Sequence, residues 1–373
     1  MASMLPDGRR LGAHLALGPG MVRTIDRAAT IGATALQVFT ADPKAWDRDA
    51  IPSAELSAFR ARLAEAGIAP LVIHAPYLVN LAASDAAYHE RSVVMLAAEL
   101  GTARRMGASI VNAHIGSHGG AGVAAGIDRL VAAVGEALNV ADDGVGRTDR
   151  GDGAAGSIGA GDLAVVDDPA GLGPPAIIAL ENSPGGRSAL GVDLDELAAI
   201  ADALDVAGIP RGRIGFCLDT AHAWSAGVDL GDPTAIDAFL DVFDARIGLD
   251  RLVLVHLNDS KSERGSGVDR HEHLGGGRIG ETGLGHLLRE PRLFGATWIL
   301  ETPGMDAGYD AINVRRAMAL ARGERLEPLP EGALTLKGSR SRAALASDVG
   351  PLASDVGPVA SDAGPLASDP AAS

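Results

Sequence analysis

Two kinds of sequence meet in Leu252-Val-Leu-Val-His256-Leu-Asn-Asp-Ser-Lys-Ser-Glu-Arg-Gly-Ser-Gly-Val-Asp269-Arg-His271. The first part is an apolar, β-branched run that is typical of a buried strand, and the second is a polar loop with two glycines. A histidine that leaves a strand, followed by Asp269-x-His271, supplies three ligands that suit zinc or a similar divalent metal. Alone, this loop would be interpreted as ordinary polar surface. Other apolar runs also end in His, Asp or Glu, and this repetition favours a metal site.

Apolar runs alternate with amphipathic stretches along most of the chain. The pattern predicts strands at 11–16, 33–40, 71–75, 109–115, 176–182, 214–220, 252–258 and 297–302, and helices at 53–67, 85–107, 122–139, 193–208 and 233–248. Eight nearly apolar strands that alternate with helices predict an α/β fold, a single closed (β/α)8 TIM barrel. An open doubly wound sheet is the alternative, but no glycine-rich dinucleotide fingerprint follows the first strand to support it.

Length and composition limit the class of protein. The chain has 373 residues, 47% of them hydrophobic, and about 250 residues suffice for one barrel. Because it contains no uninterrupted apolar run of about 18 residues and no apolar N-terminal segment of signal-peptide length, we expect a cytoplasmic protein that does not contact membranes. The single cysteine, Cys217, excludes an intramolecular disulfide framework and a cysteine-rich zinc site. A bound metal is therefore expected to have nitrogen and oxygen ligands.

Two regions depart from the alternation. Residues 141–175 are rich in Gly and Asp, which predicts a flexible insertion in a barrel domain that spans 11–327. From about residue 328 the helical pattern ends, and a repeat of seven residues with Pro and Gly begins at Ala346, which predicts a disordered tail over 328–373. Truncation near Pro330 is accordingly expected to leave stability and activity unchanged.

The formal net charge of −16 argues against a nucleic-acid partner only weakly. Residues 141–168 contribute −5 and residues 331–373 contribute −2, which leaves −9 for the remainder, before any bound divalent cation is counted. Local placement of Lys and Arg decides phosphate binding more than net charge does.

Six consecutive predicted strands end in residues that bind metals. The candidate ligands are His74, His114, Glu181, Asp219, His222, His256, Asp269, His271 and Glu301. In a barrel these strand ends meet at one mouth, where carboxylates need cations to offset their charge. Five imidazoles and four carboxylates exceed the needs of one zinc ion and suit two or three metals. Clustered metals are the usual equipment for phosphoester displacement.

The chain resembles the endonuclease IV family of apurinic/apyrimidinic endonucleases. The resemblance covers residues 11–322 apart from the insertion, and its motifs are Gly12-Ala-His14, Phe39-Thr40 with Trp46, His74-Ala-Pro-Tyr77-Leu78-Val-Asn80-Leu81, Asn112-Ala-His114-Ile-Gly-Ser-His118, Leu180-Glu181-Asn182, Leu218-Asp219-Thr220-Ala-His222-Ala, the run from His256 through Asp269-Arg270-His271 to Gly280, and Glu301-Thr302. Departures are Ile115 in place of the family's usual proline, and Gly276 where glutamate is common. Neither removes a ligand.

The resemblance implies a DNA-repair enzyme with a trinuclear zinc site that nicks duplex DNA on the 5′ side of abasic sites, leaving a 3′-hydroxyl and a 5′-deoxyribose phosphate. Its motifs assign His74, His114 and Glu181 to one zinc, Glu181, Asp219, His256 and Glu301 to a second, and His222, Asp269 and His271 to the third. Glu181 and Glu301 would be catalytic, and Glu301 would orient or deprotonate the attacking water.

Duplex DNA with abasic sites is the expected partner, and the protein is expected to act as a monomer. Candidate DNA contacts are Tyr77 and Leu78, whose motif enters the duplex in the family, Lys44, where arginine is more usual, and Lys261, Arg264 and Arg270 in the loop after the seventh strand. Two other functions remain open: a sugar isomerase or epimerase on a related metal-dependent barrel, and a metal-stabilised protein that binds damaged DNA without cutting it. Metal stoichiometry discriminates the first, and an incision assay the second.

Overall fold

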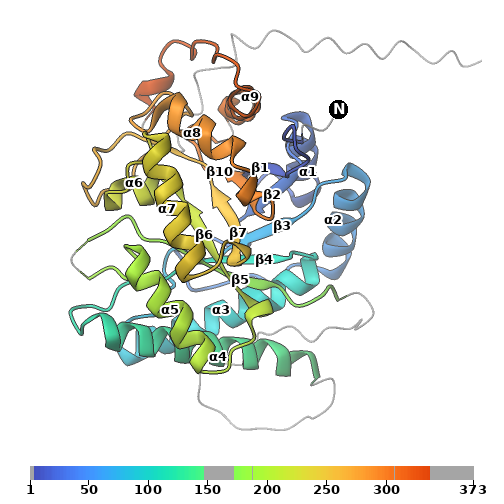
Figure 1. Ribbon diagram of the computed structural model, residues 1–373. Helices are drawn as coiled ribbons and strands as arrows, with labels where there is room; N and C mark the ends of the chain where they lie inside the picture. Colours follow the sequence, from blue (N-terminus) through green and yellow to red (C-terminus); the bar gives the residue numbers. More distant parts are fainter. Residues whose placement is uncertain (1–3, 147–171, 187, 306, 337–373) are drawn as a thin grey trace, which may run out of the picture. The chain divides into compact units, whose positions relative to one another are not determined.

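Eight parallel strands form a closed barrel with the strand order β1-β10-β7-β6-β5-β4-β3-β2. The computed structural model describes residues 4–146, 172–186, 188–305 and 307–336, and in Figure 1 the strands lie in the middle with helices around them. The strands of the barrel are β1 (Leu11–His14), β2 (Ala35–Val38), β3 (Leu71–His74), β4 (Ile110–His114), β5 (Ile177–Glu181), β6 (Ile214–Asp219), β7 (Leu252–His256) and β10 (Thr297–Leu300). The predicted fold class and all eight predicted strands are thereby confirmed.

The helices are α1 (Met21–Thr30), α2 (Ser53–Ala66), α3 (Ala86–Met106), α4 (Val123–Gly146), α5 (Leu194–Val206), α6 (Thr220–Ala226), α7 (Pro233–Arg246), α8 (Gly280–Arg289) and α9 (Tyr309–Ala321). Short 3-10 helices within the described residues are η3 (Arg211–Arg213), η4 (Leu249–Arg251), η5 (Pro291–Leu293) and η6 (Ala333–Thr335). A two-stranded antiparallel sheet joins β8 (Asp259–Ser260) to β9 (His271–Glu272). The loop between β8 and β9, residues 261–270, lies within the polar part of the stretch that begins at Leu252. No helix among the described residues combines the length and the apolar character needed to cross a membrane.

Small and branched apolar side chains fill the inside of the barrel. One buried cluster contains a residue from each of seven strands: Ala35, Val72, Ile110, Ala179, Cys217, Leu254 and Ile299. A larger cluster, which includes Leu36, Ile73 and Leu180, packs between the strands and the surrounding helices. Successive side chains of a strand point to opposite faces, so residues two positions beyond the inner cluster also face inward. The inner cluster therefore forms a floor beneath the strand ends.

Described structure extends into residues that the sequence pattern assigns to the insertion and to the tail. Helix α4 continues through residues 141–146, which were expected to belong to the insertion, and residues 147–171 lie outside the described part of the chain. At the other end, residues 328–336 pack on the barrel domain: Ala333 is 1% exposed and Leu336 is 8% exposed. The Lys261 ammonium donates a hydrogen bond of 3.1 Å to the Leu336 carbonyl oxygen. The packed chain thus extends at least to Leu336, and the predicted tail from residue 337 onward lies outside the described residues.

This C-terminal segment also gives a physical reason for the glycine at 276. A methyl group at Gly276 would lie only 2.9 Å from Leu329 Cδ1 and 3.0 Å from Leu334 Cδ2. A larger side chain at this position would have to move the side chains of Leu329 and Leu334, so glycine at 276 suits the packing of residues 328–336.

The packing changes the expected effect of truncation. Removal of residues 331–373 deletes Ala333 and Leu336, and the loss of their buried apolar surface should lower the free energy of unfolding by about 2–3 kcal/mol. Removal of residues 338–373 keeps both side chains and should leave the free energy of unfolding unchanged. Urea unfolding of the two truncated proteins beside the full chain measures the difference. Equal midpoints for both truncations would show that the segment contributes no stability.

Candidate metal centre

The inward direction of the strand ends brings the candidate ligands together. Each of five strands has a candidate ligand two positions after its residue of the inner cluster, and so on the same face. These ligands are His74 (β3), Glu181 (β5), Asp219 (β6), His256 (β7) and Glu301, which follows β10. His114 lies four positions after Ile110 and faces the same side. All six therefore gather above the floor of the barrel, as sequence analysis predicts.

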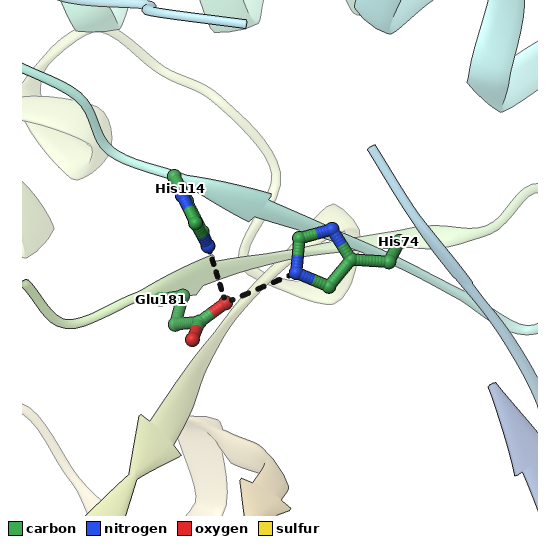
Figure 2. A group of neighbouring side chains, drawn as sticks. All are labelled: His74, His114 and Glu181. Carbon is green, nitrogen blue, oxygen red and sulfur yellow. Dashed lines mark ion pairs between the residues drawn. The ribbon is translucent and has the colours of Figure 1, made fainter. Parts of the chain in front are cut away.

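The first group contains His74, His114 and Glu181, whose donor atoms all lie within 4.8 Å of one another. Figure 2 shows both imidazoles pointing at one carboxylate oxygen: Glu181 Oε2 lies 3.6 Å from His74 Nε2 and 3.5 Å from His114 Nε2. His74 and Glu181 are buried, whereas His114 is about one-third exposed. Two nitrogens and one carboxylate oxygen on a partly open site suit a metal that keeps one position for water or substrate.

The second group contains Glu181, Asp219, His256 and Glu301. His256 Nδ1 lies 3.3 Å from Glu181 Oε1, 3.3 Å from Glu301 Oε2 and 3.8 Å from Asp219 Oδ2. Glu181 therefore belongs to both groups, with one carboxylate oxygen facing each. If both groups held a metal, Glu181 would be in a position to bind both.

The third group contains Asp219, His222 and His271, and Asp269 adjoins it. His271 Nε2 lies 3.5 Å from Asp219 Oδ2 and 3.1 Å from Asp269 Oδ1, and His222 Nε2 lies 3.4 Å from Asp269 Oδ2. Asp219 also caps helix α6, because its Oδ1 accepts a hydrogen bond of 2.9 Å from the His222 backbone N–H. Its other oxygen remains directed at the second and third groups.

Neighbouring groups hold the ligands in orientation. Asn112 Nδ2 donates to Glu181 Oε2 at 2.5 Å, and Asn258 Nδ2 donates to Asp219 Oδ2 at 2.8 Å. Three ligand imidazoles donate a hydrogen bond from Nδ1 to a backbone carbonyl oxygen. The pairs are His74 with Ala75 at 2.7 Å, His222 with Asn182 at 2.9 Å and His271 with Glu301 at 2.9 Å. A carbonyl oxygen only accepts, so in these rings Nδ1 carries the proton and Nε2 is free for a metal.

The electrostatics of the site also suit cations. Burial lowers the pKa of His74 to about 3, so its imidazole is neutral at physiological pH, the form that binds metals. Burial opposes a charged His222, but the carboxylates of Asp219, Asp269 and Glu181 raise its pKa well above the usual value. Burial likewise opposes ionisation of Glu301, yet His256 holds its pKa well below the usual range. Carboxylates that need positive neighbours and an imidazole that is neutral fit a site built for divalent metal.

Two other groups of potential ligands are less suited to a metal. Cys217 lies near Glu181 and His256, but burial raises the pKa of its thiol to about 12, so the metal-binding thiolate is disfavoured. On the outer helices, Asp237, His286 and Glu290 also come together. There the Arg292 guanidinium already pairs with Glu290 at 2.9 Å and with Asp237 at 3.4 Å. The negative charge of these carboxylates is therefore balanced by Arg292 without a metal.

The candidate DNA contacts divide into two sets. Tyr77, which is 53% exposed, and Lys44, which is exposed, follow β3 and β2 at the mouth, and Leu78 is half-buried beside Tyr77. Arg270 is exposed beside the ligand His271. Lys261 and Arg264, in contrast, already have partners. Lys261 contacts Leu336 at 3.1 Å and Glu272 at 3.7 Å, and Arg264 forms an ion pair with Asp229.

Helix α3 supports both loops that carry the first set. The Tyr88 hydroxyl donates to the Leu78 carbonyl oxygen at 2.8 Å, and the Trp46 ring packs edge-on against Tyr88 at 5.3 Å. Further along the helix, the buried Glu99 pairs with Arg48 at 2.6 Å and accepts a hydrogen bond of 2.8 Å from the Thr40 hydroxyl. The loop after β2 and the loop after β3 are therefore fixed to one helix.

Two residues of the site were not predicted as site residues. His14 and Gln37, at the ends of β1 and β2, are buried and contact Glu301 at 3.1 and 2.6 Å. The sequence marks His14 only as part of a family motif. The sequence does contain a signal for Gln37. Apart from Thr34, it is the one polar residue in the apolar run from Ala33 to Val38, and it lies two positions after Ala35, on the same face of the strand.

The fold and the ligand groups define a metal-binding (β/α)8-barrel protein whose active groups stand at the carboxyl ends of the strands. A family model described as "Xylose isomerase-like TIM barrel" matches residues 25–323. The protein named "Probable endonuclease 4" from Methanoculleus marisnigri is 36% identical over 311 residues, which cover 83% of this chain and 98% of that protein. The chain therefore belongs to the endonuclease IV family of enzymes, and the predicted resemblance is confirmed.

Solved structures agree with this assignment. The crystal structure of endonuclease IV from Thermus thermophilus matches with a TM-score of 0.67 and 33% identity, over 84% of this chain and 99% of that chain. A D-tagatose 3-epimerase-like protein matches with a TM-score of 0.54 over 84% of this chain and 98% of that chain. Its identity is only 16%, so this second likeness concerns the fold alone.

Proposed function

We propose that this protein hydrolyses the phosphodiester bond on the 5′ side of abasic sites in duplex DNA, with zinc as its cofactor, and leaves a 3′-hydroxyl and a 5′-deoxyribose phosphate. The observation that carries the proposal is the sharing of Glu181 and Asp219 among three adjoining ligand groups. A site for one metal would not need two shared carboxylates, and phosphoester displacement uses clustered metals. The endonuclease names of the relatives agree with a nucleic-acid substrate.

The family resemblance implies how the nine predicted ligands would divide among three ions. His74, His114 and Glu181 would hold one zinc, Asp219, His256 and Glu301 would hold the second together with Glu181, and His222, Asp269 and His271 would hold the third. Bound divalent ions supply a water of low pKa and positive charge beside the departing oxygen. Glu301 keeps 14% of its side chain accessible and can orient the attacking water from its place at the mouth.

The test is incision of a duplex that contains one abasic site, before and after treatment with a chelator. We expect a single cut on the 5′ side, with a 3′ end that a polymerase extends, and no cut after chelation until zinc is restored. An intact duplex of the same sequence serves as the control. Binding without incision by the zinc-loaded protein would contradict the proposal and support a binding function.

The exposed rim of the mouth supports a role in recognising the lesion. Extruding or exposing a nucleotide from a duplex costs a few kcal/mol, least where a base is already missing, so a side chain that enters the stack favours abasic sites. Tyr77 lies beside the metal centre, with its ring 5.7 Å from that of His74. We therefore assign Tyr77 and Leu78 to the abasic gap, and Lys44 and Arg270 to phosphate contacts. Lys261 and Arg264 are weaker candidates, because each already has an acidic or carbonyl partner.

The double change Tyr77→Ala, Leu78→Ala is expected to weaken binding to abasic duplex by at least tenfold, because stacking of an aromatic ring on a base contributes about 1–3 kcal/mol. Metal content should stay unchanged, since neither residue belongs to a ligand group. Fluorescence anisotropy with labelled duplex measures the affinity. Phe294→Ala is a matched control, because Phe294 is 63% exposed but precedes β10, at the end of the barrel opposite the mouth.

A flexible abasic single strand separates the two possible roles of this loop. Without a helix to enter, cleavage of the single strand should decrease much less than cleavage of the duplex. Equal losses on both substrates would show that the loop supports the metal centre instead of probing the duplex.

A further inference from the structure

One buried polar residue in the ring of strand ends has no assigned role. Gln37 is fully buried, lies two positions after Ala35 of the inner cluster, and therefore occupies in β2 the place that the ligands occupy in the other strands. Strand β2 supplies none of the grouped ligands. A glutamine in a ring of imidazoles and carboxylates is either an accident of packing or an organiser of its neighbours, and its contacts distinguish the two.

The contacts of Gln37 join two ligands on opposite sides. Its Nε2 lies 2.6 Å from Glu301 Oε1, and its Oε1 lies 2.9 Å from His256 Nε2. A carboxylate oxygen only accepts hydrogen bonds at physiological pH, so the amide nitrogen must be the atom that faces Glu301. The amide oxygen then faces His256, and it requires a proton on His256 Nε2.

This proton determines which nitrogen of His256 is available to a metal. With Nε2 protonated, the neutral ring has its lone pair on Nδ1. Nδ1 is the atom that lies 3.3 Å from both Glu181 Oε1 and Glu301 Oε2 and 3.8 Å from Asp219 Oδ2. A lone pair that faces three carboxylate oxygens is unfavourable unless positive charge lies between them, either a proton on Nδ1 or a bound metal ion. When His256 is neutral, this arrangement fits the second metal position.

The same amide also directs Glu301. The hydrogen bond from Gln37 Nε2 holds Oε1 of the carboxylate. His14 Nδ1 lies 2.9 Å from Gln37 Nε2 and 3.1 Å from Glu301 Oε1. In the barrel, His14 and Gln37 are direct register partners on β1 and β2. With Oε1 held from behind, Oε2 is the oxygen that points at His256 Nδ1.

We propose that Gln37 is a positioning residue for the second metal position: it selects the His256 tautomer that presents Nδ1, and it directs Glu301 Oε2 toward the same point. This inference rests on the proposed function for its kinetic consequences, but its effect on metal affinity does not depend on DNA cleavage. Residues that orient metal ligands typically contribute 10–100-fold to metal affinity or activity.

Two variants and one control test the proposal. Gln37→Met keeps the length of the side chain and removes both hydrogen bonds, whereas Gln37→Asn keeps the amide but is one methylene too short to reach both ligands. Ile299→Val removes one methylene from the inner cluster and typically costs 0.5–1.5 kcal/mol of stability, so it controls for mild destabilisation. Thermal unfolding shows which variants fold.

The first readout is zinc affinity by competition with a chromophoric chelator. We expect the zinc ion that His256 helps to hold to bind about 10–100-fold more weakly in both Gln37 variants. Its affinity should be unchanged in Ile299→Val. The second readout is the steady-state kinetics of incision at saturating zinc. We expect kcat to fall about tenfold or more, whereas KM for abasic duplex should change less than about twofold.

Wild-type zinc affinity and kcat in Gln37→Met would overturn the proposal. So would wild-type behaviour of Gln37→Asn alone, because polarity without the double contact would then suffice. If Gln37→Met does not fold, Gln37→Asn still provides the comparison. A wild-type protein that binds zinc but does not incise DNA would defeat the proposed function, and the affinity comparison would continue to test Gln37.

Discussion

Glu301→Gln is expected to fold normally and to lose at least about two orders of magnitude in incision rate, the effect of removing a catalytic acid–base group. Glu301 ends the last strand of the barrel, and its Oε2 lies 3.3 Å from His256 Nδ1 in the second ligand group. Glutamine has the same size and can still contact Gln37 through its oxygen. It cannot supply negative charge to a metal or accept a proton from water, so the loss should fall on kcat.

Single-turnover incision of the abasic duplex measures this loss, with metal content determined on the same sample. Glu290→Gln is the matched control, since Glu290 is a buried acid that pairs with Arg292 outside the metal centre. It should keep both the rate and the metal content of the wild type. Near-normal turnover by Glu301→Gln with a full complement of metal would rule out the catalytic role of Glu301.

The second large effect is expected for Glu181→Gln, which should lose two metals at once. Glu181 Oε2 faces His74 and His114, and Oε1 lies 3.3 Å from both His256 Nδ1 and His222 Nδ1. A neutral amide offers one oxygen in place of two and cannot bridge two cations. We expect zinc content to fall from about three equivalents to about one, and incision to fall to the rate of the chelated wild type.

His222→Asn is the informative comparison for this result. His222 lies in the third ligand group with Asp219 and His271, so this variant should lose one equivalent of zinc and retain the two ions that Glu181 would bridge. Elemental analysis of both purified proteins, after removal of loosely bound metal, measures the difference. More than two equivalents in Glu181→Gln would contradict the bridging role. A wild-type content near one would contradict the trinuclear site altogether and favour the isomerase alternative.

The strands and the ligand types could be predicted from sequence because both depend on local patterns. An apolar run that ends in His, Asp or Glu is visible without any knowledge of its neighbours, as in Leu71–His74 and Ile177–Glu181. The period of two along a strand then places each polar end on the same side as the inner cluster. Family motifs added the division of the ligands among metals, because spacing alone does not pair residues from different strands.

Other features depended on contacts between residues far apart in the chain. Asp229 forms an ion pair with Arg264, Glu272 lies close to the Lys261 ammonium, and residues 328–336 pack over Gly276. The sequence around each of these residues gives no indication of its partner. The sharing of Glu181 between two ligand groups and the double contact of Gln37 exist because the sheet closes and brings β2, β5, β7 and β10 to one mouth. Local hydrophobic periodicity specifies which face of a strand a side chain occupies, whereas closure of the barrel specifies which side chains meet there.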